Sequence, residues 1–248
     1  MKIRPLVKTA LQKAREQNVA GCIVTGRLYR ATRRFADELR FLAPVICYQG
    51  AGIYDATTGA ILREMSLSSH MTMRVTRAAK KDGMHVQLYA GDNYFVEEVN
   101  EYSRLYAHVA GVQPVVVESL EETFAGRDSL KIVLIAHANG AAEYLSRVRS
   151  LCGAEAYVTR SLPEFIEILH PAVNKGEALG FVCSHLGISL QDVLAIGDSW
   201  NDAPLLDAAG FAVAMGSAPP EIQSNADAVV SDVEHDGVAE AINNYVLR

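Results

Sequence analysis

The sequence predicts an α/β protein built on a parallel sheet, with a second α/β domain inserted into it. Two patterns indicate this architecture. Near both ends of the chain, short apolar strands alternate with amphipathic helices, whereas the middle carries longer helices and fewer strands. We therefore expect a core domain made of residues 1–65 and 165–248 and an inserted α/β domain at 66–164.

The first part of the expected core alternates helix and strand. Pro5 is tolerated in a first helical turn, and apolar residues recur at helical spacing from there to Asn18. The apolar run Val19–Val24 predicts a buried strand. An amphipathic helix at 28–39 then leads to a second strand at Pro44–Tyr48, and this order favours parallel pairing.

The chain next leaves the expected sheet. A turn at residues 57–59 separates two short apolar pairs and predicts a hairpin. Within the inserted domain, the periodicity predicts helices at 70–81, 97–109 and 140–151 and strands at 86–89 and 131–136.

Alternation returns after Lys175. The pattern predicts helices at 175–187, 201–209, 219–224 and from 237 onward, with strands at 193–196, 211–214 and 227–230. Because ligands of open parallel sheets bind beyond the carboxyl ends of the strands, residues directly after strands are the candidates for function.

Composition narrows the class of protein. The chain has 248 residues, 50% of them hydrophobic, and a formal net charge of -6, with no dense Lys/Arg block. This balance disfavours a nucleic-acid binder but allows a small anionic ligand. The four cysteines occur singly, which predicts reduced core thiols. No apolar run is long enough for a signal peptide or a membrane span, so we expect a cytoplasmic, soluble protein of unknown oligomeric state.

The segment after the strand at 193–196 carries the most specific motif. Gly197 is followed by Asp198, Asn201 and Asp202 at the start of a helix. Two carboxylates four residues apart repel each other unless a cation holds them, and Mg²⁺ prefers such hard oxygen ligands. The alternative is that Asp202 provides a helix N-terminal charge and Asp198 forms a turn.

Two further strand or helix ends carry weaker signals. Thr25 offers a hydroxyl, and Gly26 permits close backbone approach to a phosphate at the following helix N-terminus. Lys175 begins a helix, where the helix dipole disfavours a cation unless an anion is nearby. Taken alone, either could be an ordinary connection or a solvated lysine.

Together these motifs make the chain resemble the haloacid dehalogenase superfamily, specifically Cof-type phosphatases. The matching stretches are Val24-Thr25-Gly26-Arg27, Tyr48-Gln49-Gly50-Ala51, Asn174-Lys175-Gly176, Gly197-Asp198 through Asn201-Asp202, Ala214-Met215-Gly216 and Asp236-Gly237-Val238. The resemblance implies a Rossmann-like three-layer core with an inserted α/β cap that selects a small phosphorylated metabolite.

The resemblance also implies residue roles. Thr25, Lys175 and Asn201 would be catalytic, and Asp198 and Asp202 would bind Mg²⁺. The substrate-binding residues would be Gly26, Arg27, Gln49 and Gly50. The implied reaction is hydrolysis of a phosphate monoester, with sugar phosphates or phosphorylated cofactors as the substrate class.

The sequence departs from the family in three places. The expected DxDGT motif, whose first Asp is the nucleophile, is absent, and Met1–Pro5 resembles the residues that follow it. Gln49 and Ser217 each replace the usual Asn. Asp55 lies in the hairpin, where a turn role outweighs that of a substitute nucleophile. We therefore expect a truncated N-terminus and a chain that is inactive or poorly stable alone.

The sequence leaves two other functions open. A non-catalytic relative could bind a phosphorylated ligand or partner, although such a protein would have no need of a carboxylate pair for magnesium. A metal-free regulatory module that binds sugars or nucleotides would be expected to carry a glycine-rich phosphate loop, and neither GxGxxG nor GxxxxGK occurs.

Overall fold

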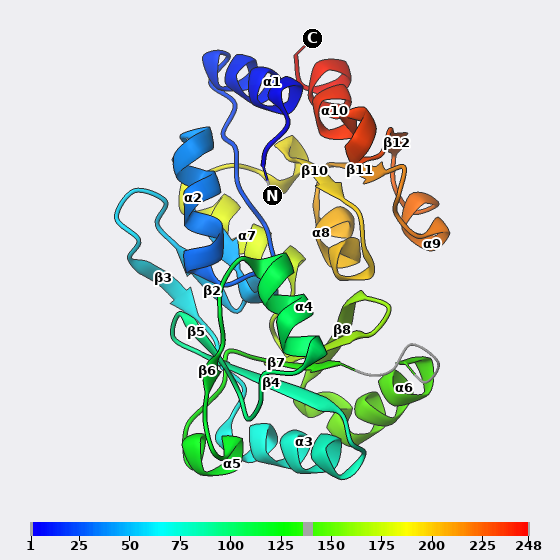
Figure 1. Cartoon of the computed structure of the whole chain (residues 1–248). Coiled ribbons are helices and arrows are strands. Elements are labelled where there is room, and N and C mark those ends of the chain that lie inside the picture. Colours follow the sequence, from blue (N-terminus) through cyan, green and yellow to red (C-terminus); the bar gives the residue numbers. More distant parts are fainter. Residues whose placement is uncertain (1, 136–140, 248) are drawn as a thin grey trace.

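The computed structural model describes residues 2–135 and 141–247 and arranges them as helices around three sheets (Figure 1). Two of the sheets have three strands each. The one formed by the C-terminal part of the chain lies with α1 (Pro5–Glu16) and α10 (Gly237–Tyr245) toward one end of the molecule, and the other lies nearer the middle. A sheet of six strands forms the other end. The predicted α/β fold class with a core and a cap is confirmed.

The C-terminal part of the core follows the predicted alternation. Strands β10 (Leu194–Gly197), β11 (Phe211–Met215) and β12 (Ala228–Val230) pair in parallel in this order. The helices of this part are α7 (Lys175–Leu186), α8 (Ala203–Ala208), α9 (Pro220–Gln223) and α10. Each predicted strand and helix is present, and apart from the first turn of the predicted helix at 201–209 the ends shift by at most two residues.

The N-terminal part of the core confirms the helices and the hairpin. Helices α1 and α2 (Tyr29–Leu39) precede β1 (Val45–Cys47), and β2 (Gly52–Tyr54) and β3 (Ile61–Glu64) form the hairpin. β1 and β3 each pair antiparallel with β2, and the three strands form a sheet separate from that of β10, β11 and β12.

The predicted strand at Val19–Val24 is wrong. Only Val24 forms a bridge, which is parallel to Ile46. Ile46 N donates to Ile23 O and Thr25 N donates to Ile46 O, each at 2.9 Å. Hydrogen bonds on one side over so short a stretch do not make a ladder, and Val19 is 41% exposed.

The six-stranded sheet contains more strands than the sequence predicted. Its order is β6 (Val115–Val116), β5 (Asn93–Val96), β4 (His85–Ala90), β7 (Lys131–Ile135), β9 (Phe165–Leu169) and β8 (Tyr157–Leu162). Only β4 and β7 were expected, and Ala136, the expected end of β7, lies outside the described residues. Because β9 belongs to this sheet, we propose a domain boundary after Leu169 rather than at 164.

Among the residues that the structure describes, four helices accompany this sheet. They are α3 (Ser69–Lys81), α4 (Glu101–Ala110), α5 (Leu120–Thr123) and α6 (Ala141–Cys152). Helix α4 starts four residues later than predicted because the Asn100 and Ser103 side chains form a reciprocal capping box. The first residue of the predicted helix at 140–151 lies outside the described residues.

The two faces of the six-stranded sheet pack differently. Ile132 and Leu134 of β7 join the cluster with α3 and α6 on the outer face, whereas Val133 and Ile135 join a cluster that includes Tyr48 of the core. Figure 1 shows α3 and α6 on one side of the sheet and α4 on the other. Successive strand residues point to opposite faces, so Lys131 shares the core-facing side with Val133.

No helix among the described residues combines the length and apolar character that crossing a membrane would require. The cysteines are free, and Cys47, Cys152 and Cys183 are buried. Burial raises the pKa of the Cys152 thiol to about 11, as expected for a core thiol. The predicted core position is confirmed for these three cysteines.

Acid is expected to weaken the fold through His85. Burial lowers the pKa of His85 to about 4, and the amide nitrogens of Gln87 and Asn100 lie 3.2 and 3.1 Å from its ring nitrogens. A depressed histidine pKa stabilises the fold above about pH 6.5, and this contribution is lost as the pH falls toward 4. Urea unfolding should show about 2–3 kcal/mol of such loss, and His85→Gln should remove that part of the pH dependence. An unchanged slope in the variant would contradict this assignment.

Candidate active site

The loop after β10 is built around the carboxylate of Asp202. Its Oδ1 accepts a hydrogen bond from Lys175 Nζ at 2.5 Å, and its Oδ2 accepts from the backbone N–H groups of Asp198 and Ser199 at 2.9 and 3.0 Å. Asp202 and Lys175 are 4% and 6% exposed. Asp202 therefore fixes the loop and holds the Lys175 ammonium at the carboxyl end of β10.

Gly197 allows this loop to close. A Cβ atom at this position would lie 2.6 Å from the Cβ of Asp202, so a larger residue would push the anchoring carboxylate away. The apolar strand thus ends at Gly197, and the lack of a side chain there leaves room for Asp202 beneath the loop.

Two oxygen donors in this loop remain available for a ligand. Asn201 is 6% exposed, and its Oδ1 atom is buried without a hydrogen-bond partner among the described residues. Asp198 lies at the exposed rim, and loss of hydration, followed by the negative charge of Asp202, raises the pKa of its carboxyl group. A divalent cation would satisfy both groups.

The donor set fits magnesium better than a softer metal. Within residues 2–135 and 141–247, no three His, Cys, Asp or Glu side chains are grouped as a metal site of their own. Mg²⁺ is commonly held by one or two carboxylates, with water and substrate phosphate completing its shell. Asp198 and Asn201 offer such a partial set, whereas both oxygens of Asp202 already accept hydrogen bonds.

The Thr25-Gly26 turn forms the second part of the site. Gln49 N donates to Thr25 O at 3.0 Å, and Arg27 N donates to Thr25 Oγ1 at 3.2 Å. Gln49 packs directly on Gly26, where a Cβ would lie 2.4 Å from its Nε2. Arg27 is half-buried, and burial lowers its pKa.

Backbone packing joins the two parts of the site. Gly50, at φ 106°, lies against the head of α7, where a Cβ would be 2.6 Å from Asn174 O. Asn174 caps α7, so it immediately precedes Lys175. Contacts therefore run without a break from the Thr25-Gly26 turn through Gly50 and Asn174 to Lys175 and the Asp198 loop.

Asp55 does not contribute to this site. Its Oδ1 accepts hydrogen bonds from Thr57 N, Thr58 N and Thr58 Oγ1 at 3.0, 2.7 and 2.8 Å. These contacts close the hairpin turn. The expectation of an ordinary turn residue is confirmed.

Gly176→Ala is expected to destabilise the fold by about 1–3 kcal/mol. A Cβ at Gly176 would lie 2.1 Å from the backbone oxygen of Pro204, so α7 and α8 would have to separate. Gly180→Ala is the matched control in the same helix, because none of the described residues has an atom within 4 Å of its added Cβ. Urea unfolding of both variants measures the difference, and equal stabilities would show that α7 can shift without cost.

The sequence interpretation missed two charged residues near the turn. Lys131 of β7 and Glu167 of β9 are each 2% exposed and form an ion pair at 2.8 Å. A signal was present, because each is the single charged residue inside an apolar strand, and the two charges are opposite.

Arg160 and Trp200 link β8 to the loop after β10. The Arg160 guanidinium lies 3.6 Å from the centre of the Trp200 ring, and Trp200 Nε1 donates to Glu221 Oε1 at 2.6 Å. Ser199 Oγ also donates to Ser161 O at 2.9 Å. These contacts place a strand of the six-stranded sheet over the loop that carries Asp198.

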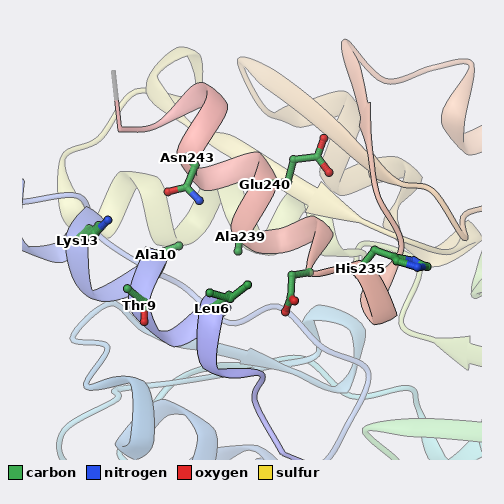
Figure 2. Close-up of a pocket in the computed structure, with 9 residues that line it drawn as sticks. Leu6, Thr9, Ala10, Lys13, His235, Ala239, Glu240 and Asn243 are labelled. Atoms are coloured by element: carbon green, nitrogen blue, oxygen red, sulfur yellow. The ribbon is translucent and has the colours of Figure 1, made fainter.

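A separate hollow lies between α1 and α10 (Figure 2). Its volume is about 390 Å³, and its lining includes Leu6, Ala10, Lys13 and Glu240. None of the predicted site residues lines it. The hollow is therefore distinct from the candidate active site.

The chain is similar to known hydrolases over nearly its whole length. A family profile described as haloacid dehalogenase-like hydrolase matches residues 1–242. The 5-amino-6-(5-phospho-D-ribitylamino)uracil phosphatase YcsE of Bacillus subtilis is 28% identical over 97% of this chain and 87% of its own length. The pyridoxal phosphate phosphatase YbhA of Escherichia coli is 26% identical over 96% and 90%.

A solved structure agrees in fold. The haloacid dehalogenase-like hydrolase from B. subtilis superimposes with a TM-score of 0.87 at 22% identity, covering 98% of this chain and 93% of that one. At this identity the likeness establishes the fold alone.

Proposed function

This chain belongs to the haloacid dehalogenase-like hydrolases, and from that premise we propose that it serves magnesium-dependent hydrolysis of phosphate monoesters on small metabolites. The observation that supports this most is the Lys175–Asp202 pair, which holds a buried ammonium beside the loop of Asp198. A fixed cation next to hard oxygen donors is suited to a phosphoryl group, whose charge it would offset.

Each residue of the site has a distinct task in this proposal. The Thr25 hydroxyl donates to a phosphate oxygen, while the Lys175 ammonium offsets negative charge on the phosphoryl group. Asp198 would hold Mg²⁺ with help from Asn201, and Asp202 keeps Lys175 and the loop in place. Magnesium, when bound, supplies charge neutralisation at the phosphate oxygens. Gly26, Arg27, Gln49 and Gly50 shape the wall around the phosphate.

We also propose that these 248 residues do not turn substrate over by themselves. Covalent phosphoryl transfer in this family needs a carboxylate that is free to attack phosphorus. Asp202 is committed to Lys175 and two backbone N–H groups, and Asp198 is assigned to the cation. Neither carboxylate is available as the nucleophile.

The names of two relatives suggest a substrate class for this chain. YcsE and YbhA are named for phosphorylated small molecules, and the acidic chain gives no support to a polyanionic partner. We therefore propose a phosphorylated sugar or cofactor.

A phosphatase assay tests this proposal. Hydrolysis of p-nitrophenyl phosphate would be followed with Mg²⁺ or EDTA, for this chain and for an extended form in which a strand with the family's DxDGT motif is fused to its N-terminus. Turnover by the extended form alone, lost in EDTA, is the expected result. Turnover by this chain would refute its proposed inactivity, and turnover unaffected by EDTA would refute the magnesium dependence.

A second candidate function is non-catalytic binding of a phosphorylated ligand. The full hydrogen bonding of Asp202 favours it, because this carboxylate supports the loop without any metal. If both forms bind phosphate but neither hydrolyses the ester, this function replaces the first.

A further inference from the structure

Lys131 and Glu167 form a buried ion pair on the core-facing side of the six-stranded sheet. They lie on neighbouring strands, and Nζ of Lys131 is 2.8 Å from Oε2 of Glu167. Lys131 Nζ also lies 4.7 Å from the centre of the Tyr89 ring. Burial alone would raise the pKa of the Glu167 carboxyl group, but the charge and hydrogen bond of Lys131 lower that pKa below its usual value. Both side chains therefore stay ionised although they are buried.

The remaining hydrogen bonds of this pair reach across to the core. Lys131 Nζ donates to Gly26 O at 2.7 Å, and Gln49 Nε2 donates to Glu167 Oε1 at 2.8 Å. Both core partners belong to the predicted phosphate-binding wall. The ion pair therefore holds two residues of the site from the opposite domain.

The bond to Gly26 fixes one particular peptide group. Gly26 C=O and Arg27 N–H belong to the same peptide plane, so an ammonium on the oxygen directs the N–H to the other side. That N–H donates to Thr25 Oγ1 at 3.2 Å. Because the hydroxyl oxygen already accepts this bond, the hydroxyl proton of Thr25 is left to donate elsewhere.

Stability alone gives a poor account of the pair. A buried ion pair contributes little net stability compared with apolar residues of the same size. A charged donor, however, holds a carbonyl more firmly than a neutral one. The arrangement is therefore better suited to holding the peptide group in one orientation than to strengthening the fold.

We propose that Lys131 and Glu167 are positioning residues for phosphate binding. They orient the Gly26–Arg27 peptide so that the Thr25 hydroxyl donates to a phosphate oxygen. Gln49, which donates to Glu167, also holds this turn, because its side chain packs on the α-carbon of Gly26. This inference rests on the proposed function, since it names how the cap contributes to that same site.

The test uses the double variant Lys131→Met/Glu167→Gln in the full chain. Removing both charges avoids a buried unpaired carboxylate, and the glutamine can still bond to Gln49. The matched control is Lys80→Met/Glu97→Gln, which removes a much more exposed pair with the same 2.8 Å separation of Nζ and Oε1. Affinity for inorganic phosphate with Mg²⁺ is measured by calorimetry, and the Gly26 carbonyl is followed by ¹³C NMR.

We expect the double variant to bind phosphate roughly tenfold or more weakly, with a shifted Gly26 carbonyl signal, while the control binds as the wild type does. Thr25→Val should weaken binding in the wild type but have little further effect in the double variant. A merely structural role would not produce this coupling.

Two failures are distinguishable. If the wild-type chain binds phosphate and the double variant binds equally well, the positioning role is wrong and the proposed function stands. If the wild-type chain binds no phosphate with Mg²⁺ present, both proposals fail. Additive effects of Thr25→Val in the two backgrounds would also overturn the positioning role.

Discussion

Replacing Lys131 by Met alone is expected to lower the free energy of unfolding by about 3–5 kcal/mol. The substitution leaves Glu167, 2% exposed, without its cation. Burial alone would raise the pKa of Glu167, but in the wild type the charge and hydrogen bond of Lys131 hold it below its usual value. In the variant, Glu167 is still buried but keeps only weaker hydrogen bonds. Its carboxyl group must therefore either stay ionised without a cation or take up a proton.

The pH dependence of this loss identifies its cause. In Lys131→Met, burial raises the pKa of Glu167 in the folded state above its unfolded value of about 4.5. The free energy of unfolding of the variant therefore falls as the pH rises above about 4.5. The stability difference between wild type and Lys131→Met should therefore be smallest in acid and largest near neutrality. Urea unfolding at several pH values measures it, and a difference independent of pH would point to lost packing instead.

Lys80→Met provides the control for this experiment. Lys80 and Glu97 form an ion pair at the same distance, but their side chains are 36% and 27% exposed. Water screens both charges, so the expected loss is within about 1 kcal/mol. The contrast isolates the effect of burial from that of losing an ion pair.

The C-terminal part of the core was predictable from the sequence because local signals agree with the packing there. Each strand is a short apolar run that ends at a glycine or a turn, and each helix begins near a residue suited to its first turn. Lys175, Asp198 and Asp202 lie at such ends, so their chemistry could be expected to meet at one edge of the sheet.

The prediction of a strand at Val19–Val24 was wrong because local sequence patterns do not show whether a strand will find partners. Its composition is that of a buried strand, but a strand also needs neighbours, and here only Ile46 pairs with it. The missed strands of the cap have a different explanation. β5 pairs with β4 and β8 pairs with β9 across turns of two residues, so their partners are local, and helical periodicity alone did not reveal these hairpins. Tertiary pairing therefore decided the outcome only at 19–24.

The sequence also could not assign Asp202 its hydrogen bonds. Spacing alone suggested two equivalent carboxylates repelling each other, whereas the structure gives Asp202 a lysine and two backbone donors. Likewise, Lys131 and Glu167 are 36 residues apart, so nothing local linked them. Partner identity at a site depends on three-dimensional contacts that residue spacing does not encode.

Asp198→Asn and Asp202→Asn are expected to have different effects on metal binding and on stability, although each should lower turnover by the extended form by roughly 10²–10³. Asp198 lies at the rim, so its loss should remove Mg²⁺ binding and leave the unfolding free energy nearly unchanged. Asp202 is 4% exposed and anchors Lys175, so its loss should also destabilise the fold by about 1–3 kcal/mol.

Measuring Mg²⁺ affinity and urea unfolding side by side separates these two roles. Asp207→Asn is the control, because this residue of α8 is exposed and lies outside the site. A stable Asp198→Asn chain that no longer binds Mg²⁺ would place the cation on Asp198, with Asp202 as its support. If Asp202→Asn instead loses Mg²⁺ at full stability, its carboxylate must leave Lys175 when the cation binds, and the division of tasks proposed for the loop would be wrong.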